Sequence, residues 1–195
     1  MNLSKTSLKS SLLIISCISG IILFSTLNST PGKDSLKQPL EIAGNEIQFP
    51  VNLLIPRLNI NTTVETVGVS FDGSMDIPKH PDNVAWYDLG PLPGEIGSAV
   101  INGHSGYRNN QSAIFDNLSE LQKGDEIHVE NKEGILQTFV VREIKSYDRK
   151  SDTTSIFNSY DSLAHLNLIT CSGAWDEVAG THSDRLVVFA DKVSP

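Results

Sequence analysis

The stretch His165-Leu166-Asn167-Leu168-Ile169-Thr170-Cys171-Ser172-Gly173 decides the fold, because it joins a strand-forming run to a reactive type of side chain. Apolar and β-branched residues dominate positions 165–170, which predicts a buried strand. Ser172-Gly173 then predicts a turn. The strand would present the Cys171 thiol at its end, although a lone cysteine is more often a small buried side chain than a reactive one.

Similar short runs occur on both sides of this one, separated by turn residues such as those at 72–73 and 133–134. Many short strands with turns between them predict a mostly β fold and, most specifically, a closed β-barrel. One helix is predicted over 112–121, where apolar residues recur at helical spacing. The other predicted strands are 51–60, 62–70, 98–102, 126–130, 136–147 and 185–190.

Composition narrows the class of protein. The chain has 195 residues, of which 39% are hydrophobic and 19% charged, as in a globular protein and unlike a disordered one. Its net charge of -8 provides no basic surface for phosphates, so nucleic acid is not an expected partner. Cys17 and Cys171 lie in regions of different character, and a disulfide between them is not expected.

The N-terminal region has the pattern of a membrane anchor. Residues 10–27 contain no charge and are long enough to span a bilayer as a helix. Because no A-x-A-like cleavage site follows, an uncleaved anchor is favoured over a signal peptide. Lys5 and Lys9 place residues 1–9 in the cytoplasm and the rest outside the cell. Residues 28–49 form a predicted linker, and 50–195 the folded domain.

Two further residues could act with Cys171. His104 follows an apolar run and is flanked by glycines, and its imidazole can serve as acid or base near neutral pH. Arg185 opens the last predicted strand and carries a permanent charge with forked N–H donors. Taken alone, a histidine or an arginine at such a position more often has a structural role than a catalytic one. Strand ends in a barrel can converge on one rim, however, so the three together indicate a thiolate nucleophile with its supporting groups.

The motifs around these residues resemble those of the sortase family. Positions 167–171 are similar to its Thr-Leu-x-Thr-Cys signature, with Asn167 standing where the signature has Thr. His104, Cys171 and Arg185 follow in the order found in that family, and 83–104 is similar to its class E and class F branches. The resemblance covers the whole of 50–195.

This resemblance implies a sortase-type closed β-barrel of about eight strands, with one or two short helices, preceded by an N-terminal transmembrane helix. It also implies a membrane-anchored cysteine transpeptidase at a Gram-positive cell surface, with its catalytic domain extracellular. Such enzymes cleave an LPxTG-like sorting motif after Thr through a thioester and transfer the acyl fragment to an amine of the cell envelope. Cys171 would be the nucleophile, His104 the general acid and base, and Arg185 the stabiliser of substrate and oxyanion.

Substrate contacts are assigned to three residues. Thr170, next to the nucleophile in the signature, would shape the substrate groove. The polar segment 149–162 contains Ile156 and Phe157 as apolar exceptions, and we expect it to form a wall of the groove for the motif's Leu and Pro. The expected partners are thus surface proteins that bear the sorting motif and an envelope amine.

No cofactor or metal is predicted. The histidines other than His104 lack zinc-ligand spacing, and the acidic residues lack a D-x-D-x-D-G calcium pattern, although calcium binding stays possible. Papain-like enzymes carry their Cys before their His, unlike this chain, and the signature of caspase-like enzymes is absent from it. The alternative of another class is a noncatalytic, membrane-tethered β-domain that binds a surface peptide or polysaccharide, with Trp86, Tyr87 and Trp175 as contact residues.

Overall fold

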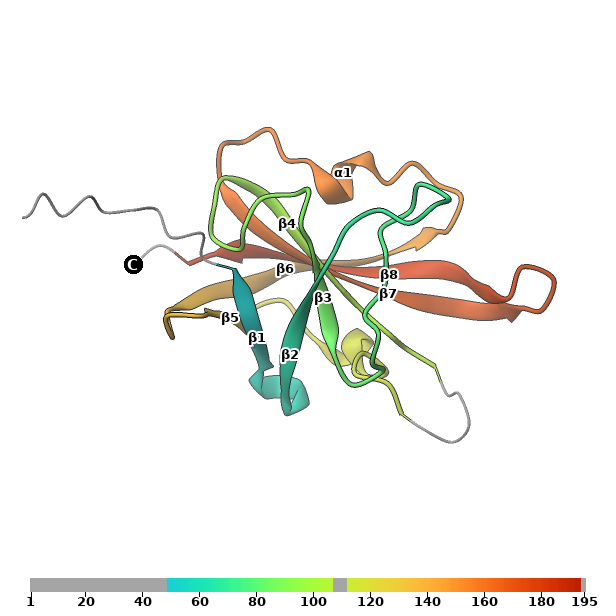
Figure 1. Ribbon diagram of the computed structural model, residues 1–195, viewed down its shortest axis with the longest axis horizontal. Helices are drawn as coiled ribbons and strands as arrows, with labels where there is room; N and C mark the ends of the chain where they lie inside the picture. Colours follow the sequence, from blue (N-terminus) through green and yellow to red (C-terminus); the bar gives the residue numbers. More distant parts are fainter. Residues whose placement is uncertain (1–48, 107–111, 194–195) are drawn as a thin grey trace, which may run out of the picture. The chain divides into compact units, whose positions relative to one another are not determined.

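The computed structural model describes residues 49–106 and 112–193 (Figure 1). The predicted cytoplasmic segment 1–9, the predicted anchor 10–27 and all but the last residue of the linker 28–49 lie outside these residues. In the part of the chain that is described, no helix combines the length and apolar character needed to cross a membrane.

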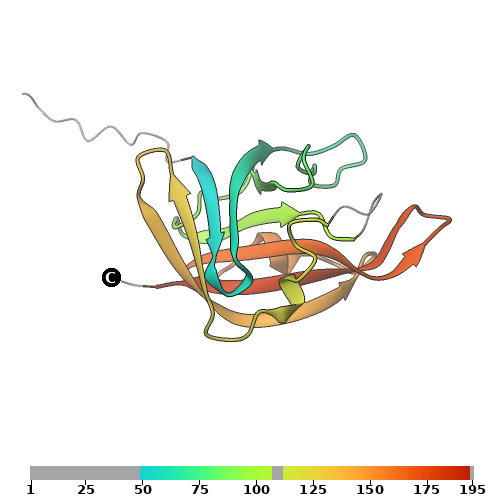
Figure 2. The same ribbon diagram turned by 90° about the horizontal axis from the view of Figure 1, so that it is seen from below.

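Eight strands close into a barrel in the order β1-β2-β3-β4-β7-β8-β6-β5, which confirms the mostly β, closed-barrel part of the predicted fold. The pairs β2–β3 and β4–β7 are parallel. Figure 2 shows the ring of strands from a second direction. The strands are β1 (Pro50–Ile55), β2 (Ile60–Val67), β3 (Val84–Tyr87), β4 (Gly97–Gly103), β5 (Glu126–Asn131), β6 (Leu136–Asp148), β7 (Ala164–Asp176) and β8 (Thr181–Lys192).

Among the residues that the structure describes, helical structure is limited to α1 (Thr154–Phe157) and two 3-10 turns, η1 (Pro56–Leu58) and η2 (Leu118–Glu120). The predicted helix over 112–121 is wrong. The Asp116 carboxylate accepts hydrogen bonds from the backbone N–H groups of Gly106 and Ala113, which favours turns there. Phe115 and Leu118 are nevertheless buried, so the apolar pattern correctly identified the side chains that face the core.

The strand prediction also departs from the structure at 51–60 and at β3. The run 51–60 is broken at Pro56, which cannot donate a ladder hydrogen bond, and Asn59 then adopts a left-handed backbone with φ 53°. Strand β3 was not predicted, because four residues with their first three side chains buried show no alternation.

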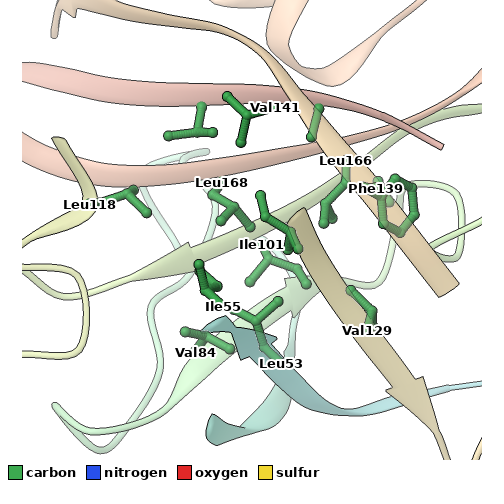
Figure 3. Packing of buried hydrophobic residues seen from close by; sticks show 14 of the residues in the cluster. Leu53, Ile55, Val84, Ile101, Leu118, Val129, Phe139, Val141, Leu166 and Leu168 are labelled. Atoms are coloured by element: carbon green, nitrogen blue, oxygen red, sulfur yellow. The ribbon is translucent and has the colours of Figure 1, made fainter. Parts of the chain in front are cut away.

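The barrel interior is filled by apolar side chains from every strand, including Leu53, Ile101, Phe139 and Leu168 (Figure 3). A second, smaller apolar cluster consists of Ile156, Val187 and Phe189. Val187 alternates along β8 with the interior residue Val188, so this second cluster lies on the outer face of the barrel. Helix α1 therefore covers part of the outer face of β7 and β8.

Strands β7 and β8 continue beyond Cys171 as a two-stranded ribbon, seen in red and orange at the right of Figure 1. The turn predicted at Ser172-Gly173 is wrong, because pairing is only interrupted between Ser172 and Trp175 and resumes at Trp175↔His182. Gly173 has φ 78°, a backbone that suits glycine at this irregularity. Cys171 thus lies within a long strand, where β7 leaves the closed part of the barrel.

Candidate active site

Strand register brings Cys171 and Arg185 together. The two residues are directly paired between the antiparallel strands β7 and β8, and paired residues share one face of a sheet. The pair Ile169↔Val187 lies two residues away on the same face, and Val187 belongs to the cluster under α1. The thiol and the guanidinium therefore both lie on the outer face of the barrel. Cys171 is partly exposed, as a reacting thiol must be.

His104 joins them from the parallel strand β4. The last paired residues of β4 and β7 are Asn102 and Ile169. Contact continues beyond them, because the Thr170 hydroxyl donates to the Gly103 carbonyl at 2.8 Å and the Ser105 hydroxyl donates to the Cys171 carbonyl. His104 lies between these two contacts and, by alternation from Asn102, on the outer face with Cys171.

The hydrogen bond of the His104 ring fixes which nitrogen carries a proton. Its Nε2 lies 2.9 Å from the backbone carbonyl of Pro78. A carbonyl oxygen can only accept, so Nε2 must donate, and Nδ1 is the nitrogen left to exchange a proton. The Asn102 amide donates to the Asp76 carbonyl at 2.8 Å, so residues 76–78 run beside β4 and support this orientation.

The Arg185 guanidinium is held by its own strand. Nη1 donates to the carbonyls of His182 and Asp184 at 3.1 and 2.8 Å, and Nη2 donates to the Thr181 hydroxyl at 3.2 Å. Arginine carries more N–H groups than these three bonds use. The group is therefore positioned in advance and keeps donors for an anionic oxygen.

Apolar side chains extend the site along the barrel away from Cys171. Ile169, which is partly exposed, forms its floor above the buried Val187, and Phe157 of α1 packs against this cluster. Tyr87 of β3 packs edge-on against Phe157, with 5.4 Å between the ring centroids. We call these four residues, with Asn102 of β4, the groove face. It leads from α1 to the three catalytic candidates.

The three residues predicted to contact substrate occupy different positions. Phe157 is only partly buried and lies on the groove face. Ile156 is 1% exposed, so it supports Phe157 from below rather than facing the groove. Thr170 is 4% exposed and alternates with Cys171 toward the interior, where its hydroxyl joins β7 to β4. Its position indicates that it aligns His104 with Cys171.

Several contributing residues were not predicted from the sequence. Ser105 is adjacent to His104, so its position was a usable signal. Tyr87 was considered only as a contact residue of a noncatalytic domain. Pro78 and Asp76 act through backbone carbonyls, for which side-chain chemistry gives no signal.

A cavity of about 580 Å³ adjoins Cys171 on the side toward the barrel end. Its lining includes Thr170, Ser105 and Asp116 together with Cys171. The sulfur therefore borders both the groove face and a second open space. Across residues 49–106 and 112–193, no group of three or more His, Cys, Asp or Glu side chains is arranged to hold a metal ion.

Gly103 is required for the close packing beside His104. A Cβ atom at this position would lie 2.5 and 2.8 Å from ring carbons of Phe115, which is 1% exposed. We expect Gly103→Ala to lower the free energy of unfolding by about 1–3 kcal/mol, measured by urea denaturation, and to reduce activity. Gly68→Ala is the control, because its Cβ would meet only Asp88 Oδ1 at 3.5 Å. Equal stability of the two variants would contradict the packing argument.

Comparison with known proteins agrees with the barrel fold described above. A family model described as "Sortase domain" matches residues 53–193. No curated protein matches the chain. The chain is similar to solved structures of sortase C-1 from Actinomyces oris, with 24% identity, TM-score 0.59 and coverage of 75% of this chain and 76% of that one.

Two further structures show the same fold. A sortase D5 transpeptidase from Clostridium perfringens has 23% identity and a TM-score of 0.55, with coverage of 75% of this chain and 79% of that one. Sortase A from Corynebacterium diphtheriae has 23% identity and a TM-score of 0.58, with coverage of 76% and 62%. These relatives are of classes C, D and A, so the predicted similarity to class E or F stays a prediction.

Proposed function

Because the chain belongs to the sortase family of cysteine transpeptidases, we propose that it cleaves an LPxTG-like sorting motif after Thr and transfers the acyl fragment to an envelope amine. The observation that carries this proposal is the register that pairs Cys171 with Arg185 and sets His104 beside them on one face. A noncatalytic binding domain would leave this convergence without a role.

In the proposed reaction, the Cys171 sulfur attacks the carbonyl carbon of the motif's Thr and a carbon–sulfur bond forms. His104 takes the thiol proton at Nδ1 and delivers it to the departing amine as the carbon–nitrogen bond breaks. An incoming amine then attacks the thioester, loses a proton to His104, and the thiol leaves. Arg185 donates hydrogen bonds to the oxygen that becomes negative in both steps.

The groove face supports an apolar sorting motif. Ile169 lies two residues from Cys171 along β7 and is partly exposed, so side chains upstream of the scissile bond would meet apolar surface there. Phe157 and Tyr87 border this floor. A Leu-Pro pair fits such a surface by burial of apolar area.

Arg185→Lys is expected to lower kcat for a quenched sorting peptide by about 100-fold, because an ammonium cannot reproduce the forked donors held over the oxyanion. KM should change less. Arg57→Lys is the matched control, since Arg57 is an exposed arginine of η1. An Arg185→Lys enzyme with kcat within twofold of the unaltered enzyme would remove the oxyanion role.

A membrane location is the second part of the proposal. The uncharged residues 10–27, preceded by Lys5 and Lys9, support a single-pass anchor with the catalytic domain outside. Fractionation of expressing cells, followed by protease treatment of intact protoplasts, tests it. Recovery of the chain in the soluble cytoplasmic fraction would contradict this location.

The decisive experiment on activity combines peptide cleavage with analysis of the products. A quenched LPxTG peptide is incubated with the enzyme, with and without an added amine such as triglycine, and the products are weighed by mass spectrometry. We expect the acyl fragment to carry the amine when it is present and water when it is absent. Cleavage at another bond would contradict the proposed motif.

A further inference from the structure

The segment between β6 and β7 carries α1 and Phe157, yet much of it is poorly packed. Tyr160 and Leu163 are 89% and 59% exposed. A cavity of about 360 Å³ lies beneath it, lined by loop residues such as Ser155 and Ser159 and by His165 and Asn167 of β7. Apolar packing at α1 therefore holds only one part of this segment.

Two polar side chains of β7 form hydrogen bonds with the segment, one to a residue within α1 and one to a residue after it. The Asn167 amide, 1% exposed, donates to the Ile156 carbonyl at 2.6 Å. His165 Nε2 lies 2.9 and 3.0 Å from the two carboxylate oxygens of Asp161. Because β7 also carries Cys171, the segment is tied to the strand that delivers the nucleophile.

His165 is bonded at both ring nitrogens. Its Nδ1 lies 2.7 Å from Asp191 Oδ1 of β8, and the side chain is only 4% exposed. Arg142 of β6 donates to the same Asp191 oxygen at 2.8 Å. Ionised carboxylates only accept, so both ring nitrogens must donate and the bonded ring is an imidazolium. Two carboxylates then balance two cations.

We propose that His165, bridging Asp161 and Asp191, is a positioning residue that holds the α1 segment over the groove face and thereby sets affinity for the sorting motif. The inference rests on the proposed function. Loss of the bridge would release Asp161, loosen residues 153–161 and disorder the Phe157 wall of the groove. Cys171, His104 and Arg185 would keep their register, which β4, β7 and β8 fix independently.

The bridge favours the ionised form of the Asp161 carboxylate. The His165 hydrogen bond lowers the pKa of Asp161, so this carboxylate stays ionised as pH falls through the usual aspartate range. Asp191 and Arg142 are the other charged groups that bond within this network.

The test compares His165→Gln and Asp161→Ala with His128→Gln in the full chain. His128 is a matched control, because it is a part-buried barrel histidine whose ring contacts Thr138 and Glu126, away from the segment. Asp161 is half exposed, so its replacement tests the bridge even if His165→Gln fails to fold. Amide hydrogen exchange of peptides within 150–163 and steady-state kinetics with the LPxTG peptide are measured for each variant and for the unaltered enzyme.

In both bridge variants we expect exchange in 150–163 to rise severalfold and KM to rise about tenfold, with kcat within about twofold of the unaltered enzyme. Unchanged exchange in Asp161→Ala, or a KM for Asp161→Ala equal to that of the unaltered enzyme, would overturn the proposal. Exchange needs no turnover, so it judges the bridge even if the sorting peptide is not cleaved.

Discussion

Cys171→Ala is expected to abolish cleavage of the sorting peptide, with a loss of at least about a thousandfold in kcat/KM. The change removes the atom that forms the thioester, and no neighbouring group can replace it. The side chain is partly exposed, outside the two apolar clusters, so truncation should leave the barrel folded. The assay should use a Cys17→Ser background, in which Cys171 is the chain's remaining cysteine.

The covalent intermediate provides an independent measurement. Rapid acid quench and intact-mass analysis should show the Cys17→Ser enzyme carrying the acyl fragment of the peptide, and the Cys171→Ala variant carrying none. An iodoacetamide-treated enzyme should behave like Cys171→Ala. Cleavage by the alanine variant at the unaltered rate would show that the thiol is not the nucleophile.

His104→Ala is expected to lower kcat by about a thousandfold, the usual range for loss of a positioned acid and base. Within residues 49–106 and 112–193 the ring has a single hydrogen bond, to the Pro78 carbonyl, so stability should change little. His128→Gln serves as the control, since it alters a histidine of β5 whose partners lie on β5 and β6.

The tautomer argument makes the His104 prediction sharper. Since Nε2 donates to the Pro78 carbonyl, nitrogen NMR of the labelled neutral ring should show the proton on Nε2. A neutral ring protonated at Nδ1 would contradict this geometry. If His104→Ala had the kcat of the unaltered enzyme, His104 would not be the acid and base of the reaction.

The barrel and the identity of the three catalytic candidates were predictable because they depend on patterns within each strand. Alternating and apolar runs marked seven of the eight strands, and motifs in the right order marked Cys171, His104 and Arg185. Their convergence depends on parallel pairing of β4 with β7, which brings together residues about 67 positions apart. The pairing itself was not predicted; the sequence indicated only that strand ends in a barrel can converge on one rim.

What could not be predicted depends on backbone atoms and long-range partners. The 112–121 pattern marked buried side chains correctly, but the Asp116 carboxylate favours turns over a helix. The carbonyl of Pro78 that orients His104 has no side-chain signature. Ile156 was expected in the groove, yet its apolar character places it beneath Phe157 instead, because a short helix buries one side and exposes another.

The strands that carry the groove face are hydrogen-bonded on both sides, β4 by β3 and β7, and β7 by β4 and β8. The main-chain groups of these strands are already hydrogen-bonded, so an extended peptide that lies over them cannot bind by adding a strand to the sheet. The peptide must therefore be recognised by individual side chains of the groove face. Preference for one peptide over another can therefore diverge among related enzymes by single replacements that leave the ladder intact.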